Sequence, residues 1–171
     1  MGLNFSKQFL PIFLLIALIL VWTSVWSLFK IAIEAIPPLS FRVIIGIPAF
    51  ALLLFLGFKK VKTVYVPKSD FKPLLLISFF NVTLWQVLML YGINMLGGGR
   101  AAVLTYTMPV WATIFASIFG YERINISIIV SLILGMTGIF FLSLEINVFE
   151  NIFGFLITLS AGLSWAIGTM I

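Results

Sequence analysis

Tryptophan, tyrosine and amide side chains recur at helical spacing along this 171-residue chain, within stretches that are otherwise apolar. Trp22 and Trp26 lie four residues apart, and so do Asn81 and Trp85, which places each pair on one face of a helix. The indole rings offer flat surfaces for stacking, and the amide offers one or two hydrogen bonds. Where such side chains line a cavity, they would suit planar or amphipathic solutes.

The side chains that most catalysis requires are scarce. The chain has no Cys and no His, which excludes disulfides, thiolate nucleophiles, Cys/His metal sites and imidazole acid–base catalysis. Within the apolar stretches no two titratable groups are spaced for general acid–base work, and no Asp, Glu or His lies at mid-depth for proton or sodium coupling. We therefore expect neither an enzyme nor a bound cofactor or metal ion.

Five polar or aromatic residues each admit two interpretations. Trp26 and Tyr91 are either anchors at the membrane interface or part of a binding site. Asn81 and Gln86 either join neighbouring helices or line a cavity, because an unpaired amide in lipid costs several kcal/mol. Arg42 either extends to the membrane surface or faces an anion.

Threonines around a proline have a structural explanation. Thr105, Thr107 and Thr113 are expected to bond to carbonyls of their own helix. Pro109 breaks the helical ladder, and a carbonyl one turn earlier, near Thr105, thereby loses its partner. Membrane helices tolerate such a break beside a cavity or a neighbouring helix.

Two further patterns concern packing and surface charge. Small residues at helical spacing predict a close-packing seam on one helix, formed by Ser127, Ser131, Gly135 and Gly138. Lys30 and Glu34 are four residues apart and are expected to form an ion pair.

The elements that carry these residues are predicted to be membrane-spanning helices. The chain is 63% hydrophobic and only 9% charged, with a mean hydropathy of +1.25, which excludes a water-soluble globule. A bilayer core needs about 20 apolar residues per helix, and six segments meet this length: 9–29, 39–58, 73–96, 101–119, 126–144 and 152–171. Short turns join them at Pro37-Pro38, at Gly97 to Gly99 and at Gly120. The predicted fold is therefore all-α, one polytopic membrane helix bundle of about six transmembrane helices.

The basic residues predict the orientation of this bundle. With the N terminus inside, seven basic residues fall on the inner side, namely Lys7, Lys59, Lys60, Lys62, Lys68, Lys72 and Arg123. The outer side then receives three, Lys30, Arg42 and Arg100, so the positive-inside rule favours an N-inside chain. The lysine loop is too small for a nucleic-acid surface, and the partners expected are the lipid bilayer and a small-molecule substrate. We expect a multi-pass protein of the plasma membrane, the inner membrane in a bacterium.

An ordered set of motifs resembles a known family. Residues 99–111, Gly-Arg-Ala-Ala-Val-Leu-Thr-Tyr-Thr-Met-Pro-Val-Trp, are similar to the fourth helix of the EamA-like branch of the drug/metabolite transporter superfamily. The turn Gly-Tyr-Glu-Arg-Ile at 120–124 follows, as in that family, and Gly135 and Gly138 agree with its fifth helix. Trp22 and the pair at 41–42, Phe-Arg, occupy places where the family tends to carry such residues.

The resemblance implies a ten-helix carrier built from two inverted five-helix repeats. Residues 1–148 would form the first repeat, and 149–171 would be the first helix of a truncated second repeat, with Trp165 matching Trp22. By the same resemblance, Glu122 and Arg123 would pin the tight inner turn. The candidate substrate-binding residues carried over from the family are Trp22, Trp26, Asn81, Trp85, Tyr106 and Trp111.

The function that the resemblance implies is export of small metabolites, amino acids or amphipathic drugs by alternating access. Two alternatives stay open. The chain could work as a homo-oligomer, in the manner of the small homodimeric multidrug carriers, or it could need a missing second half. It could also be a non-transporting membrane subunit or an inactive truncated product.

Overall fold

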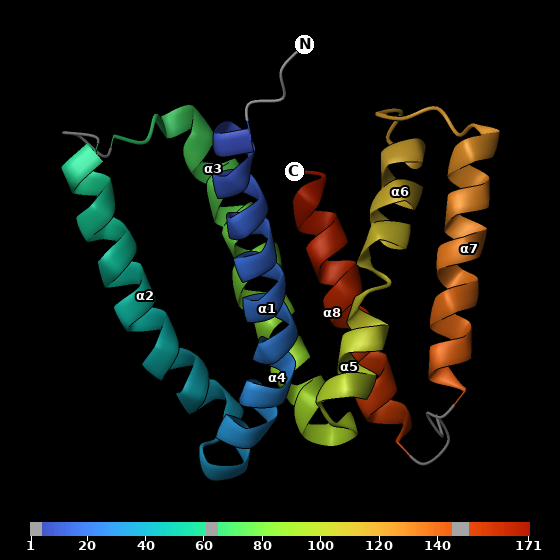
Figure 1. Ribbon diagram of the computed structural model, residues 1–171, viewed down its shortest axis with the longest axis horizontal. Helices are drawn as coiled ribbons and strands as arrows, with labels where there is room; N and C mark the ends of the chain where they lie inside the picture. The colour runs from blue at the N-terminus through green and yellow to red at the C-terminus, as the bar shows by residue number, and fades with distance from the viewer. Residues whose placement is uncertain (1–4, 61–64, 145–150) are drawn as a thin grey trace.

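The computed structural model describes residues 5–60, 65–144 and 151–171, and its described elements are all helices (Figure 1). In chain order they are α1 (Phe5–Ala35), α2 (Pro38–Lys60), α3 (Lys68–Ile77), the π-helix η1 (Ser78–Leu84), α4 (Trp85–Leu96), α5 (Gly98–Thr105), α6 (Met108–Ile118), α7 (Ile126–Ser143) and α8 (Ile152–Thr169).

Among the described residues, five helical segments are long and apolar enough to cross a membrane, and they confirm five of the six predicted spans. They are Phe9–Ala35, Pro38–Lys60, Lys68–Leu96, Gly98–Ile118 and Ile152–Thr169. A shorter apolar helix, Ile126–Phe141, occupies the place of the remaining predicted span. The predicted domain boundary at residue 148 lies outside the described residues.

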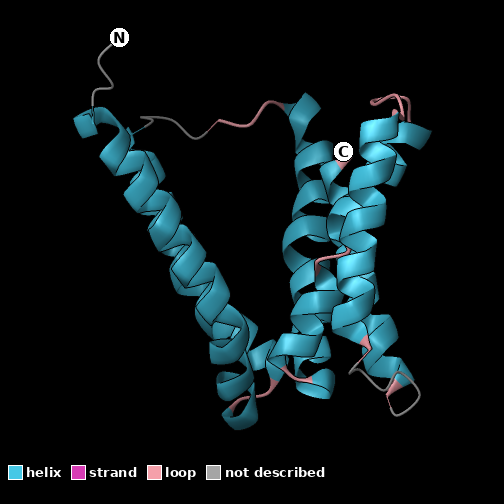
Figure 2. Ribbon diagram, turned by 45° about the vertical axis from the view of Figure 1, so that its right-hand side comes forward, coloured by secondary structure: helices cyan, strands magenta, loops and turns pink. Residues whose placement is uncertain are grey.

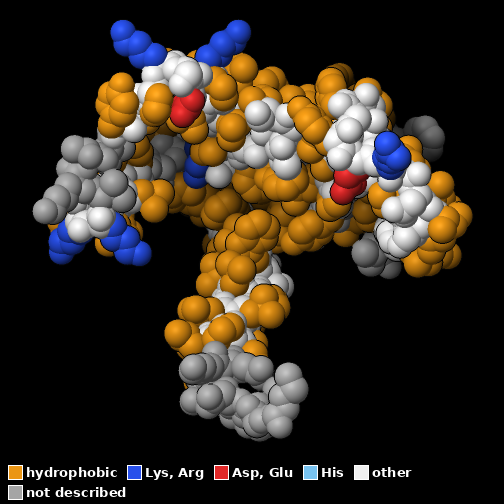
Figure 3. All heavy atoms as spheres, turned by 90° about the horizontal axis from the view of Figure 1, so that it is seen from above, with side chains coloured by type: hydrophobic (Ala, Val, Ile, Leu, Met, Phe, Trp, Pro, Cys, Tyr) orange, Lys and Arg blue, Asp and Glu red, His pale blue; other side chains and the backbone are white. Residues whose placement is uncertain are grey.

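The ends of these helices separate the basic residues as the sequence predicts. Both termini, the α2–α3 connection and the α6–α7 turn lie at one end of the bundle (Figure 1). Viewed from this end, basic side chains lie around the rim, over the ends of α2 and α3 and over the α6–α7 turn (Figure 3). Lys62 and the side chain of Lys7 lie outside the described residues. At the opposite end Lys30 pairs with Glu34 at 3.5 Å, which confirms that prediction.

The helix interruption near Pro109 falls where the sequence predicts it. α5 ends at Thr105 and α6 begins at Met108, because Pro109 has no N–H to donate to the carbonyl of Thr105. The hydroxyls of Thr105 and Thr107 donate to the carbonyls of Ala101 and Leu104, each at 2.8 Å. The hydroxyl of Thr113 likewise donates to the carbonyl of Pro109. The predicted bonding of these three threonines to nearby backbone carbonyls is therefore confirmed.

Close helix packing is centred on α8 rather than on α7. The buried residues of α8 are nearly all small: Gly154, Thr158, Ala161, Gly162, Ser164, Ala166 and Gly168. A Cβ on Gly162 would lie 3.2 Å from the carbonyl of Thr105, so α8 contacts the α5–α6 break backbone to backbone. No described atom outside α7 lies within 4 Å of a Cβ built on Gly135 or Gly138, so the described residues show no close packing at the seam predicted there. The sequence does carry a signal for close packing on α8, which the prediction above does not use. Small residues recur there every four positions, at Gly154, Thr158 and Gly162.

α1 and α2 diverge from the rest of the bundle. Residues 9–16 and 18–24 of α1 are exposed, whereas Trp26 and Ile33 are buried in the core together with Phe41 of α2. Figure 2 shows α1, overlapped by α2 in this view, slanting away from the remaining helices, and Figure 3 shows α1 as a largely hydrophobic arm. These two helices therefore contact the bundle mainly near the turn that joins them.

The α6–α7 turn is held by its backbone and one side-chain cap. Gly120 has a φ of +76°, and the N–H groups of the next two residues donate to the carbonyl of Ala116 at 2.8 and 3.1 Å. The Asn125 side chain accepts from the Ile128 N–H at 3.0 Å and caps α7. Among the described residues the side chains of Glu122 and Arg123 have no ion pair, so the role expected for them has no support here.

Two neighbouring glycines at the start of α5 offer a matched test of the joint with α1. A Cβ on Gly98 would lie 2.8 Å from the carbonyl oxygen of Trp26, whereas a Cβ on Gly99 would have no described atom within 4 Å. We expect Gly98→Ala to lower the free energy of unfolding by about 1–3 kcal/mol. Gly99→Ala should change it by less than about 0.5 kcal/mol. Thermal unfolding of the two variants in detergent would measure the difference in stability. Equal unfolding midpoints would contradict the close approach of Gly98 to the Trp26 carbonyl.

Candidate functional site

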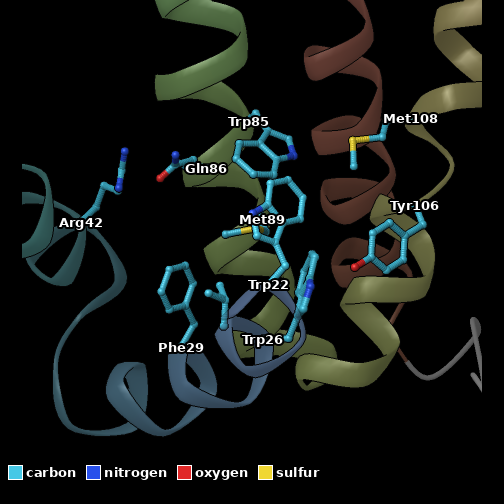
Figure 4. Close-up of a pocket in the computed structure, with 10 residues that line it drawn as sticks. Trp22, Trp26, Phe29, Arg42, Trp85, Gln86, Met89, Tyr106 and Met108 are labelled. Carbon is cyan, nitrogen blue, oxygen red and sulfur yellow. The ribbon is translucent and has the colours of Figure 1, made fainter. Parts of the chain in front are cut away.

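A cavity of about 280 Å³ lies where α1, α2 and α4 meet the α5–α6 break (Figure 4). It is lined by Trp22, Val25, Trp26, Phe29, Arg42, Trp85, Gln86, Met89, Tyr106 and Met108. Four of the six predicted binding residues are therefore brought together, although they come from three separate regions of the sequence: Trp22, Trp26, Trp85 and Tyr106. The lining is mostly aromatic and apolar, with a few polar groups.

The α1 wall of the cavity is built by one helical face. Trp26 is only 9% exposed and packs edge-on against Tyr106, with ring centroids 5.9 Å apart and an interplanar angle of 62°. Trp22 lies one turn earlier, is 53% exposed and also faces the cavity. Trp26 therefore fixes α1 against the α5–α6 break, while Trp22 is free to contact a bound molecule.

Arg42 and Gln86 form the polar end of the cavity. Figure 4 shows the Arg42 side chain extending away from the α1–α2 turn and toward the Gln86 amide. Phe29 packs edge-on against Phe41 at 5.2 Å between centroids, which holds the start of α2 beside α1. Arg42 is the only charged residue in the lining, and no ion pair or hydrogen bond joins it to another described residue.

The position of Trp85 depends on the π-helix that precedes it. In η1 the backbone N–H of Trp85 donates to the carbonyl of Phe80, five residues earlier, instead of four. The same carbonyl accepts a hydrogen bond from the Ser164 hydroxyl of α8 at 2.8 Å. The wider turn and the contact with α8 together set which side chains of α4 face the cavity. The Trp85 Nε1 is buried and has no hydrogen-bond partner among the described residues.

Asn81 and Trp111 lie outside this cavity. Asn81 faces α8, where a Cβ on Gly168 would collide with its amide, and its Oδ1 has no described hydrogen-bond partner. Trp111 lines a separate cavity between α6, α7 and α8, and its Nε1 donates to the Thr107 hydroxyl at 3.2 Å. Both residues therefore lie at helix contacts that involve α8, away from the other four candidates.

Several lining residues were not among the predicted binding residues. Val25 and Phe29 continue the helical face of Trp22, and Met89 lies one turn after Trp85, so their spacing was a usable signal. Met108 carries no such signal, because it enters the cavity only through the helix break before α6. Gln86, for which the sequence leaves cavity lining open as one alternative, lines the cavity, and so does Arg42.

The arrangement is suited to binding a small molecule. The described residues contain no cluster of three or more Asp, Glu, His or Cys that could hold a metal ion. The lining has no carboxylate, and its Arg42 has no base within the site. Stacking surfaces with a few directed polar groups are typical of a small-molecule pocket.

An aromatic cavity among membrane-spanning helices fits the class of helical membrane transporters, and comparison with known proteins identifies the family. The chain belongs to the EamA-like transporter family, which matches residues 9–144. It is therefore a multi-pass membrane protein of a transporter family.

Similar proteins include bacterial relatives that bear transporter names. The "Uncharacterized transporter YoaV" of Bacillus subtilis is 30% identical over 162 residues, which are 91% of this chain and 54% of that protein. The "Uncharacterized inner membrane transporter YedA" of Escherichia coli K12 is 29% identical over 171 residues, covering 96% of this chain and 54% of that protein. The chain thus spans about half the length of these relatives. No solved structure matches it.

Two serines of α8 provide a test of how Trp85 is positioned. Ser164 donates to the Phe80 carbonyl of η1, whereas the exposed Ser160 bonds only to Leu156 of its own helix, each at 2.8 Å. We expect Ser164→Ala to destabilise the chain by about 1 kcal/mol, because one interhelical hydrogen bond is lost. Ser160→Ala should leave the unfolding midpoint within error of the wild type. The measurement is the thermal unfolding midpoint of each variant in detergent. Equal midpoints for the two variants would contradict a stabilising role of the hydrogen bond between Ser164 and the Phe80 carbonyl.

Proposed function

We propose that this chain forms the substrate site of a small-molecule exporter, and that the cavity beside Trp22 and Trp85 binds the transported solute. The observation that carries the proposal is the cavity itself, which gathers aromatic side chains and one amide among membrane-spanning helices. Its volume of about 280 Å³ matches a small metabolite, an amino acid or a compact amphipathic drug. The family to which the chain belongs supports transport rather than catalysis.

Alternating access is the mechanism that the helix arrangement favours. α4 and the α5–α6 break pack against α8, whereas residues 9–16 and 18–24 of α1 have little burial. One wall of the cavity is thus held by close packing, and the other belongs to helices attached mainly at one end. Tilting α1 and α2 about that end would open or close the cavity with little loss of buried contact.

Further helices are proposed to complete the pathway, supplied either by more chain or by a second copy. Two observations support this: the chain spans about half of its relatives, and the faces of α1 and α7 are largely exposed. The intact mass in the native membrane, combined with chemical cross-linking, separates the cases. A mass near 19.1 kDa with a cross-linked dimer indicates a second copy, and a much larger mass indicates more chain. A chain of that mass that binds another protein and moves no solute would favour a non-transporting subunit.

The cavity is tested by a pair of exposed aromatic residues on α1. Trp22, 53% exposed, lines the cavity, whereas Phe13, 55% exposed, lies outside it. Trp22→Leu should fold normally and weaken apparent solute affinity roughly two- to tenfold, because a stacking surface is lost. Phe13→Leu should transport as the wild type does.

The measurement is efflux of labelled amino acids, purines and amphipathic dyes from vesicles that contain the protein. Vesicles sorted by orientation would show whether transport runs outward from the N-terminal side, as export requires. A folded Trp22→Leu or Trp85→Ala variant that moves every tested solute at the wild-type rate would remove these residues from the site.

A further inference from the structure

Arg42 differs from the other basic residues that the structure describes. Lys30 pairs with Glu34, and the Lys59 ammonium lies 4.5 Å from the centre of the Phe55 ring near the end of α2. Arg100 is exposed at the end of the bundle opposite to the termini. Arg42 is instead half-buried within a membrane-spanning helix and lines the cavity.

The charge of Arg42 has no partner in the described part of the chain. No carboxylate lines the cavity, and no ion pair or hydrogen bond to Arg42 is present. A charged side chain within a membrane-spanning helix is costly unless it is paired or reaches the membrane surface. The second explanation fits poorly, because the side chain extends away from the nearby α1–α2 turn and toward Gln86 (Figure 4).

The surroundings of Arg42 suit one kind of ligand group. A guanidinium binds a carboxylate through two parallel hydrogen bonds, and these bonds gain strength where water is scarce. Gln86 beside it can donate a further hydrogen bond from its amide. Phe29, Trp22 and Trp85 line the same cavity and provide apolar surface for the rest of a ligand, and Trp26 lies farther along it, beside Tyr106 (Figure 4).

We propose that the cavity selects organic monocarboxylates with an aromatic or similarly flat body. The carboxylate would bind at Arg42 and Gln86, and the ring would lie among Trp22, Trp26 and Trp85. One arginine compensates a single negative charge, so a dianion such as a phosphate monoester would carry an unpaired charge into the membrane. This inference rests on the proposed function and adds the chemical class of the substrate to it.

Three probes of the same shape test the inference on the purified 171-residue chain in lipid nanodiscs. Phenylacetate is an anion, phenylacetamide is its neutral counterpart, and phenethylamine is a cation. Quenching of the tryptophan fluorescence by each probe gives its affinity, since three indoles line the cavity. We expect phenylacetate to bind roughly tenfold more tightly than phenylacetamide, and phenethylamine to bind most weakly.

Substitutions at two arginines assign the selectivity to one side chain. Arg42→Gln should bring phenylacetate and phenylacetamide to equal affinity while the amide binds as before, and Arg42→Lys should keep part of the preference. Arg100→Gln is the matched control, because Arg100 is exposed and outside the cavity, and it should keep the full preference. If Arg42→Gln fails to fold, the three probes on the wild-type chain still decide the question.

Each remaining outcome contradicts a defined part of the argument. Equal affinities for the three probes, or a preference for the amide or the cation, would overturn selection of carboxylates and leave an aromatic binding site in place. An undiminished preference for phenylacetate in Arg42→Gln would overturn the assignment to Arg42. Absence of quenching by all three probes would overturn the cavity as a binding site, and the proposed function with it.

Discussion

The close approach of α8 to the helices around it is the constraint on which the rest of the fold depends. Small side chains let backbones meet in a membrane, where dispersion contacts and interhelical hydrogen bonds replace the hydrophobic effect as the source of association. Gly162 meets the α5–α6 break, and Ser164 binds the Phe80 carbonyl of η1. A larger residue at Gly92 would collide with Thr158, so α4 is fixed in the same way. Through these contacts α8 sets where Trp85 and Tyr106 lie, although α8 lines no part of their cavity.

Two interrupted helices give the cavity its shape, and side-chain hydroxyls bond to backbone carbonyls at both interruptions. Breaking a helix in lipid exposes backbone groups that must find partners within the protein. At the break before α6 the hydroxyls of Thr105 and Thr107 bond to nearby carbonyls, and in η1 the Phe80 carbonyl serves both Trp85 and Ser164. Irregular backbone is therefore placed beside the cavity and against α8, where a neighbouring helix supports it.

The cavity combines a wall held by packing with a wall that is only partly attached. α4 and the α5–α6 break belong to the first, and α1 with α2 to the second. Trp26 links the two through its contact with Tyr106. In our proposal an anion bound at Arg42, which belongs to the partly attached wall, would favour closure of the cavity, because closure removes water from around the ion pair.

The sequence alone determined the membrane class, the spans, the short turns and the break at Pro109, because apolar length, glycine and proline act locally on the chain. It also placed Trp22 and Trp26 on one helical face, as the cavity has them.

Only the tertiary structure decided which faces meet. Asn81 and Trp85 share a helical spacing, yet η1 widens the turn between them and α8 covers Asn81. Trp111 follows the α5–α6 break and lies on the side of α7 and α8 instead. Helical periodicity gives a residue's direction only within an unbroken helix, and the rotation of one segment against the next is set by packing with α8.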